Sequence, residues 1–281
     1  MLLAEMLHSK GIDSVIVEAK SRDYVLSRIR AGVLEQGTVD ILRSLGLGER
    51  MDREGHPHDG MKIVWAGQDS FFIDVNKHIG KQFMAYGQTN IQEDLFKACD
   101  QRKGNILLEA HDVQLMDIAS KAPYVTFTHE GQSRRLDCEF IAGCDGFHGV
   151  SRKAIPKHVL KEFERVYPFG WLGVLSRTKP VSPELIYAKH DRGFALCSLR
   201  SQVLSRYYIQ VPVTDSVDNW SDDAFWAELK RRLPAEVAAA FEDSTHDKVI
   251  RFETEAALSK TGKDVGTPIL TFNPKSGNEA S

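Results

Sequence analysis

The chain opens with a helical pattern that leads directly into an apolar strand. Apolar residues at positions 2, 3, 6 and 7 fall on one helical face, and Gly11 provides a stop signal. The strand-like run IDSVIVE follows at residues 12–18. A helix that feeds such a strand is the second half of a βαβ unit. We therefore expect the first strand of that unit, and the glycine-rich phosphate loop after it, to belong before Met1.

Helical and strand patterns alternate over the first 146 residues. Helical periodicity predicts helices at 33–45 and 90–102. Alternation predicts strands at 61–65, 70–74, 106–109, 113–116, 124–129 and 134–140, the first two forming a hairpin that turns at Gly67. The run FIAGCDG at 140–146 is interpreted as a buried strand that ends in a glycine-rich turn.

The second part of the chain is rich in strands. Residues 167–213 are mostly of strand type, and a helix is predicted over 222–233 after an N-cap at Ser221. Alternation followed by strands predicts a two-domain α/β (α+β) fold, with an incomplete Rossmann-like nucleotide-binding domain and a mostly antiparallel β domain. From about residue 261 the composition is typical of a loose tail.

Composition restricts the class of protein without naming a function. The 281 residues are 42% hydrophobic with a net charge of −3, which excludes disorder and argues against a nucleic-acid partner. No apolar run is long enough to span a membrane, and MLLAEMLHSKG lacks the basic flank and cleavage site of a secretory signal. The four cysteines show no CxxC spacing, so a reducing, cytoplasmic location is expected.

Three groups of polar residues are candidate nucleotide contacts. Glu18 ends the second strand of the expected βαβ unit, where an acid can bind ribose hydroxyls, although position alone favours a solvated loop entry. Arg28 and Arg30 precede a predicted helix and could bind phosphate, or form a solvated basic loop. Asp145 follows the FIAGCDG strand, at a sheet edge where ligands bind, but Asp-Gly is also a common turn.

A hairpin within GFALCSLRSQVLSRYYIQV brings together a possible anion site. If residues 202–204 form its loop, Arg200 faces Arg206 and Ser198 faces Tyr208, all on one side. Two opposed arginines repel each other unless an anion lies beside them, and a carboxylate could take both an arginine pair and the hydroxyls. The alternative is that both arginines extend into water. Nothing in the local sequence distinguishes Tyr187 or His58.

Motifs spread over roughly residues 1–250 resemble a known family. They are SRIRAGVLEQG, YGQTN, IAGCDGFHGVSR, ERVYPFGWLGVL, PELIYA, RGFALCSLRS and SRYYIQVP. On these motifs the chain resembles the 4-hydroxybenzoate 3-monooxygenase (para-hydroxybenzoate hydroxylase) family of single-component FAD-dependent aromatic hydroxylases. The resemblance implies FAD, NADPH and O2 as co-reactants, and conversion of 4-hydroxybenzoate to 3,4-dihydroxybenzoate. It also suggests a homodimer.

The resemblance assigns site residues by position. It implies a substrate carboxylate bound by Ser198, Arg200 and Tyr208, and a phenol proton passed from Tyr187 towards His58. The implied FAD contacts are Glu18, Arg28, Arg30, Gln88, Asp145 and Arg206. The implied NADPH contacts are Tyr24, His148 and Arg152, together with Arg30. Because Ala19 stands where the family has a basic residue after the acid, NADH is a possible reductant as well.

The resemblance also predicts the domain boundaries and leaves alternative functions open. The FAD-binding domain is expected over 1–57 and 86–165, the inserted substrate domain over 58–85 and 166–250, and a divergent tail over 251–281. Expected family segments are missing at both ends, so the alternatives are an active hydroxylase and a truncated fragment that binds an aromatic carboxylate weakly, without flavin. A third possibility is a non-catalytic interaction protein on the same scaffold.

Overall fold

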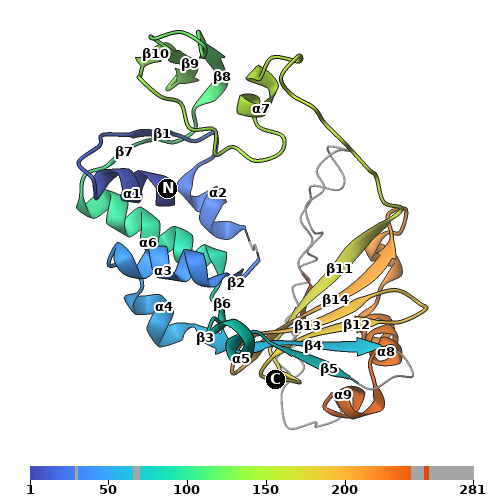
Figure 1. The fold of residues 1–281 in the computed structure, drawn as a ribbon. Coiled ribbons are helices and arrows are strands. Elements are labelled where there is room, and N and C mark those ends of the chain that lie inside the picture. Colours follow the sequence, from blue (N-terminus) through green and yellow to red (C-terminus); the bar gives the residue numbers. More distant parts are fainter. Residues whose placement is uncertain (29–30, 66–69, 242–249, 253–281) are drawn as a thin grey trace, which may run out of the picture. The chain divides into compact units, whose positions relative to one another are not determined.

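The computed structural model describes residues 1–28, 31–65, 70–241 and 250–252. Contacts divide the chain into two units, Met1–Ile29 with Thr89–Arg165 and Arg30–Gln88 with Val166–Ser281 (Figure 1). This division puts residues 30–57 in the second unit, whereas the sequence assigned them to the first domain. The difference arises because a strand at Val33–Leu34 (β2) pairs with β6 (Phe83–Ala85), which also pairs with β3 (His56–His58).

The first unit contains a short parallel sheet and a separate antiparallel one. β1 (Val15–Val17) pairs in parallel with β7 (Asn105–Leu107), and β8, β9 and β10 form the antiparallel sheet. The remaining bounds are α1 Leu2–His8, α2 Arg22–Ser27, α6 Gln88–Gln101, β8 His111–Met116, β9 Tyr124–His129, β10 Gln132–Asp137 and α7 Val150–Ala154. A parallel strand pair whose two strands are separated by helices in the sequence is what a Rossmann-like fold predicts for this unit.

The prediction of a strand at residues 140–146 is wrong. These residues have no regular secondary structure, and Phe140 is 88% exposed. The last backbone hydrogen bond of the preceding sheet runs from the Cys138 N–H to the Pro123 carbonyl. An apolar run becomes a strand only where a neighbouring strand accepts and donates its backbone hydrogen bonds, and no described strand pairs with this one.

The second unit is built on a seven-stranded, mostly antiparallel sheet. Its strand order is β15-β11-β14-β13-β12-β4-β5, and only the β12–β4 pair is parallel. The strand bounds are β4 Gly60–Trp65, β5 Phe71–Asp74, β11 Phe169–Ser176, β12 Leu185–Lys189, β13 Ala195–Ser201, β14 Leu204–Pro212 and β15 Ile250–Phe252. The helix bounds are α3 Gln36–Ser44, α4 Glu49–Glu54, α5 Val75–Ile79, the 3-10 turn η1 Val217–Asn219, α8 Asp222–Arg232 and α9 Ala235–Ala239.

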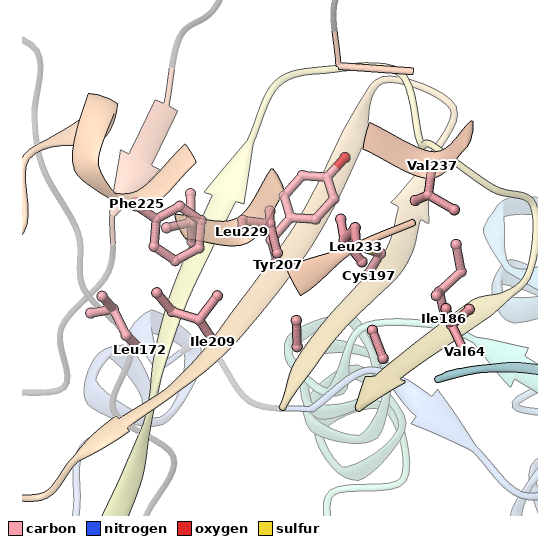
Figure 2. Packing of buried hydrophobic residues seen from close by; sticks show 13 residues of the cluster. Val64, Leu172, Ile186, Cys197, Tyr207, Ile209, Phe225, Leu229, Leu233 and Val237 are labelled. Atoms are coloured by element: carbon pink, nitrogen blue, oxygen red, sulfur yellow. The ribbon is translucent and has the colours of Figure 1, made fainter. Parts of the chain in front are cut away.

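Helices α8 and α9 cover one face of the large sheet and form the core with it (Figure 2). Alternate strand residues such as Ile186, Cys197 and Ile209 point to this face and are buried. Phe225 and Leu229 of α8 pack on them and are 0% exposed. The opposite face of the same strands therefore carries the other set of alternate residues.

The main expectations for the fold are confirmed, with local shifts. The mixed α/β and antiparallel β fold class is as predicted, and the Ser221 hydroxyl accepts the Ala224 N–H at the start of α8. The helix predicted from residue 33 begins later, at Gln36, because the two residues before Glu35 pair with β6 instead. Gly67 and the tail from residue 261 lie outside the described residues. No helix in the described ranges is long and apolar enough to cross a membrane.

Candidate functional site

A cavity of about 550 Å³ lies on the sheet face opposite α8 and α9. Its lining comes from alternate positions of β11, β12, β13 and β14 and from the loop before β13. The lining residues are Phe169, Trp171, Tyr187, Phe194, Leu196, Tyr208 and Gln210. Mostly aromatic walls with a few polar groups are typical of a small-molecule site, and the volume is in the usual range for one.

The aromatic side chains of the cavity contact one another. The Phe194 ring centroid lies 5.3 Å from that of Trp171 and 5.7 Å from that of Tyr187. These are edge-to-face and tilted arrangements, which aromatic rings prefer. Burial raises the pKa of the Tyr187 phenol, so its hydroxyl stays protonated at neutral pH and can donate a hydrogen bond. The cavity is therefore suited to a flat aromatic ring with a polar substituent.

Positive charge gathers at Tyr208, on one wall of the cavity. The Arg206 guanidinium lies over the Tyr208 ring, 4.7 Å from its centroid, and Arg206 is only 3% exposed. Burial raises the pKa of Tyr208, while the positive charges of Arg206 and Arg200 act in the opposite direction. Two guanidinium groups close to a buried phenol favour an anionic ligand, which is one of the two alternatives that the hairpin pattern left open.

The hairpin that carries these residues forms, but its predicted register is wrong. Ser198 pairs with Arg206 and Leu196 pairs with Tyr208, so Arg200 does not face Arg206. The ladder shifts at Arg200, which is the extra residue of a bulge between Leu199 and Ser201. A two-residue turn at 202–203 closes the hairpin in place of the three-residue loop, and the bulge absorbs the difference.

Arg200 packs against the backbone of Gly32. A Cβ atom at position 32 would lie 1.5 Å from Arg200 Nη1 and 2.3 Å from its Cζ. Gly32 is buried directly before β2, and its carbonyl accepts the Tyr86 N–H. The absence of a side chain at position 32 therefore creates the space that the guanidinium fills.

Two other residues predicted to act on the substrate, Ser198 and His58, are buried in the chain's second unit. Ser198 is 8% exposed, and its hydroxyl donates to the Leu199 carbonyl at 3.3 Å. His58 is 0% exposed at the end of β3, and it is not among the residues that line the cavity. The structure thus brings Tyr187 and Tyr208 into one cavity, whereas Ser198, Arg200 and His58 are not among the residues that line it.

In the first unit, the predicted nucleotide contacts Arg28 and Tyr24 are in contact with each other. The Arg28 guanidinium stacks over the Tyr24 ring at 4.3 Å, and its buried Nε has no hydrogen-bond partner among the described residues. Glu18 directly follows β1, and its carboxylate accepts the Lys20 N–H at 2.8 Å. An unsatisfied guanidinium donor and a strand-end carboxylate fit the phosphate and ribose of a nucleotide. Arg30 lies outside the described residues.

The other predicted nucleotide contacts are occupied within the protein or exposed. The Asp145 carboxylate accepts the Ser151 N–H at 2.9 Å. Burial raises the pKa of Asp145, but hydrogen bonds from the Ser151 and Val150 backbone outweigh this and lower it. Asp145 therefore stabilises the start of α7, and the sheet edge expected for it is absent. Gln88, the first residue of α6, is exposed.

His148 and Arg152 share one contact, the Phe147 ring. The His148 ring meets the Phe147 ring edge-on with centroids 4.9 Å apart, and the Arg152 guanidinium lies 4.1 Å from the Phe147 centroid. Arg152 also pairs with Glu162 at 2.6 Å. The structure therefore brings these two predicted NADPH contacts together.

Sequence reasoning missed most of the cavity wall. Phe169, Trp171, Phe194 and Gln210 were not singled out, although alternation along the predicted strands places Phe169 and Trp171 on one face. Gly32 carried no local signal, because its role depends on a side chain from a distant strand.

Comparisons with known proteins agree with the resemblance found in the sequence. Residues 1–261 match the FAD binding domain family. The chain is 52% identical over 237 residues to the p-hydroxybenzoate hydroxylase of Acinetobacter baylyi, an alignment that covers 84% of this chain and 58% of that protein. The chain thus spans 58% of the length of this curated relative.

Solved structures support the fold. The Pseudomonas aeruginosa PqsL complex with 2-aminobenzoylacetate has a TM-score of 0.70 at 17% identity, covering 90% of this chain and 71% of that chain. The p-nitrophenol 4-monooxygenase PnpA from Pseudomonas putida DLL-E4 has a TM-score of 0.68 at 13% identity, covering 84% and 60%. From its sequence and its fold, the chain belongs to the FAD binding domain family.

Proposed function

We propose that this protein is a flavin-dependent monooxygenase that hydroxylates 4-hydroxybenzoate to 3,4-dihydroxybenzoate. The observation that carries the proposal is the aromatic cavity beside Tyr208, where two arginine charges act on a buried phenol. The 52% identity to a p-hydroxybenzoate hydroxylase supports this choice of substrate. A ligand with an aromatic ring and a carboxylate can pack its ring against the aromatic walls and pair its carboxylate with the arginine charges.

The substrate carboxylate is assigned to the charged wall of the cavity. Arg200 and Tyr208 would bind it by charge-assisted hydrogen bonds, with Ser198 as a further hydroxyl partner. The ring would lie among the aromatic walls of the cavity, which would shield part of it from water. At the other end, the protonated Tyr187 hydroxyl would hydrogen-bond the substrate phenol and pass its proton on towards His58.

The cofactors FAD and NADPH, or NADH in its place, belong to the same proposal. Bound FAD supplies the chemistry that takes electrons from the nicotinamide and activates O2. Support for its binding comes from the family match and from the unsatisfied Arg28 Nε. The FAD contacts would be Glu18, Arg28, Arg30, Gln88, Asp145 and Arg206. The NADPH contacts would be Tyr24, His148 and Arg152. The resemblance also favours a homodimer in the cytoplasm.

The test separates binding from turnover. Dissociation constants for 4-hydroxybenzoate, benzoate and phenol are measured from the change in tryptophan fluorescence, because Trp171 lines the cavity. Nicotinamide oxidation and 3,4-dihydroxybenzoate formation are then followed with FAD supplied. We expect 4-hydroxybenzoate to bind more tightly than phenol and to be the substrate that is hydroxylated.

Two results would contradict the proposal. Equal stimulation of nicotinamide oxidation by benzoate and 4-hydroxybenzoate would show that the substrate phenol and its proton transfer through Tyr187 are not needed. Tight binding of 4-hydroxybenzoate without any product, with FAD present, would leave a protein that binds aromatic carboxylates but does not hydroxylate them.

A further inference from the structure

One carboxylate joins the starts of two parallel strands in the second unit. Glu184 directly precedes β12, and its side chain accepts the N–H of Asp59 at 3.2 Å and the N–H of Gly60 at 3.4 Å. Gly60 begins β4, the parallel neighbour of β12. Glu184 and Asp59 are 125 positions apart in the sequence. The carboxylate therefore fixes the end of β3 next to the strand that carries Tyr187.

The same carboxylate lies beside the buried His58 ring. Glu184 Oε2 is 3.3 Å from His58 Nδ1, and the Glu184 side chain is 21% exposed while that of His58 is 0% exposed. Both ring nitrogens are buried, and neither has a hydrogen-bond partner of good geometry in the described part of the chain, so the contact at Nδ1 is a close approach of the carboxylate and Nε2 has no neighbour of that kind. A carboxylate next to Nδ1 favours the tautomer with the proton on Nδ1, which leaves the Nε2 lone pair available as a base.

Burial of His58 and the acidic group beside it shift the pKa of His58 in opposite directions. Burial lowers the pKa of His58, whereas the negative charge of Glu184 and the Pro183 carbonyl raise it, and the neighbouring His56 lowers it slightly. The nearby Asp59 carboxylate already accepts hydrogen bonds from Asn76 and Gln82. Glu184 is thus the acidic group that acts on His58.

We propose that Glu184 is a positioning residue that holds His58 as the Nδ1–H tautomer and balances its charge when Nε2 takes up a proton. Each uptake converts neutral imidazole beside a carboxylate into imidazolium beside a carboxylate, and release of the same proton restores the neutral ring. The partly exposed carboxylate lies between the buried ring and water. This inference rests on the proposed function, because that function supplies the proton which His58 receives.

The test observes His58 directly and needs neither FAD nor turnover. Nitrogen-15 NMR of the full chain with labelled histidine measures the pKa and tautomer of His58, whose signal is assigned by its loss in His58→Gln. In Glu184→Gln, the single amide oxygen can accept one of the two backbone N–H groups, which now donate to different carboxylate oxygens, so thermal unfolding of the variant is measured to check that it folds. We expect Glu184→Gln to lower the pKa of His58 and to shift the ring towards the Nε2–H tautomer.

Two further variants control for structural effects. Glu184→Asp keeps the charge and should restore part of the wild-type pKa and tautomer. Glu236→Gln removes an exposed carboxylate on α9 and should change neither. With FAD supplied, we expect Glu184→Gln to lower kcat for 4-hydroxybenzoate about tenfold and to leave KM within about twofold, since only proton transfer is affected.

The outcomes separate this inference from the proposed function. If His58 keeps its wild-type pKa and tautomer in Glu184→Gln, the role of Glu184 is refuted, whatever the activity. If the NMR changes appear as expected but the wild-type protein forms no hydroxylated product, the proposed function fails and the Glu184–His58 pairing stands.

Discussion

Replacing Gly32 by alanine should weaken binding of the substrate carboxylate without unfolding the protein. The new Cβ would lie 1.5 Å from Arg200 Nη1, whereas ordinary van der Waals contact begins near 3.4 Å, so the guanidinium must move by about 2 Å. The clash falls on the flexible end of an arginine, which can move without disturbing the β-sheet. A shift of this size breaks a charge-assisted hydrogen bond to a bound carboxylate.

The expected loss follows from the strength of that bond. A hydrogen bond to a charged group contributes about 1.5–3 kcal/mol, so the dissociation constant for 4-hydroxybenzoate should rise about 10- to 150-fold. Phenol has no carboxylate, so its dissociation constant should stay within about twofold. Fluorescence titration of both ligands against wild type and Gly32→Ala gives the comparison.

Gly37→Ala is the matched control. Gly37 lies in α3 with nothing within 4 Å of a Cβ placed on it, so this alanine should leave both dissociation constants unchanged. Replacing a helical glycine should also raise the free energy of unfolding, by up to about 1 kcal/mol. The reasoning is refuted if Gly32→Ala binds 4-hydroxybenzoate as tightly as wild type does, or if the dissociation constant for phenol rises by the same factor as that for 4-hydroxybenzoate.

Three other predictions test catalysis, the core and a buried ion pair. Tyr187→Phe should leave 4-hydroxybenzoate binding nearly unchanged and lower product formation at least about 100-fold, measured by chromatography, because the proton can no longer leave through its hydroxyl. Phe225→Ala should lower the free energy of unfolding by about 3–5 kcal/mol in urea denaturation, since Phe225 is 0% exposed in the core, whereas Phe71→Ala at a 64% exposed position should change it by less than about 0.5 kcal/mol. Burial raises the pKa of Glu228, but hydrogen bonds from two arginines outweigh this and hold it below its ordinary 4.5. A carboxyl group whose pKa is lower in the folded than in the unfolded state stabilises the protein at pH values above its unfolded-state pKa. That stabilisation is lost as the pH falls through its folded-state pKa. The free energy of unfolding should therefore decrease as the pH is lowered from about 4.5, and Glu228→Gln should flatten this pH dependence.

The sequence by itself determined the strands of residues 167–213 and the faces of their side chains. Alternation along residues 167–213 predicted the strands, and the same alternation put Ser198 and Tyr208 on one side of the hairpin, opposite the buried Cys197 and Tyr207. The N-cap at Ser221 was also predicted correctly. These features depend on periodicity and on contacts within a few residues, and a local sequence specifies both.

Only the tertiary structure decided register and long-range contact. The bulge at Arg200 shifted the predicted pairing, and the run at 140–146 formed no strand because no neighbour pairs with it. The space at Gly32 is filled from a strand far along the chain, and Glu184 reaches His58 across 125 or more positions. Such contacts are set by how elements pack together, which no local pattern encodes, so the residues that position the site became visible only in the folded protein.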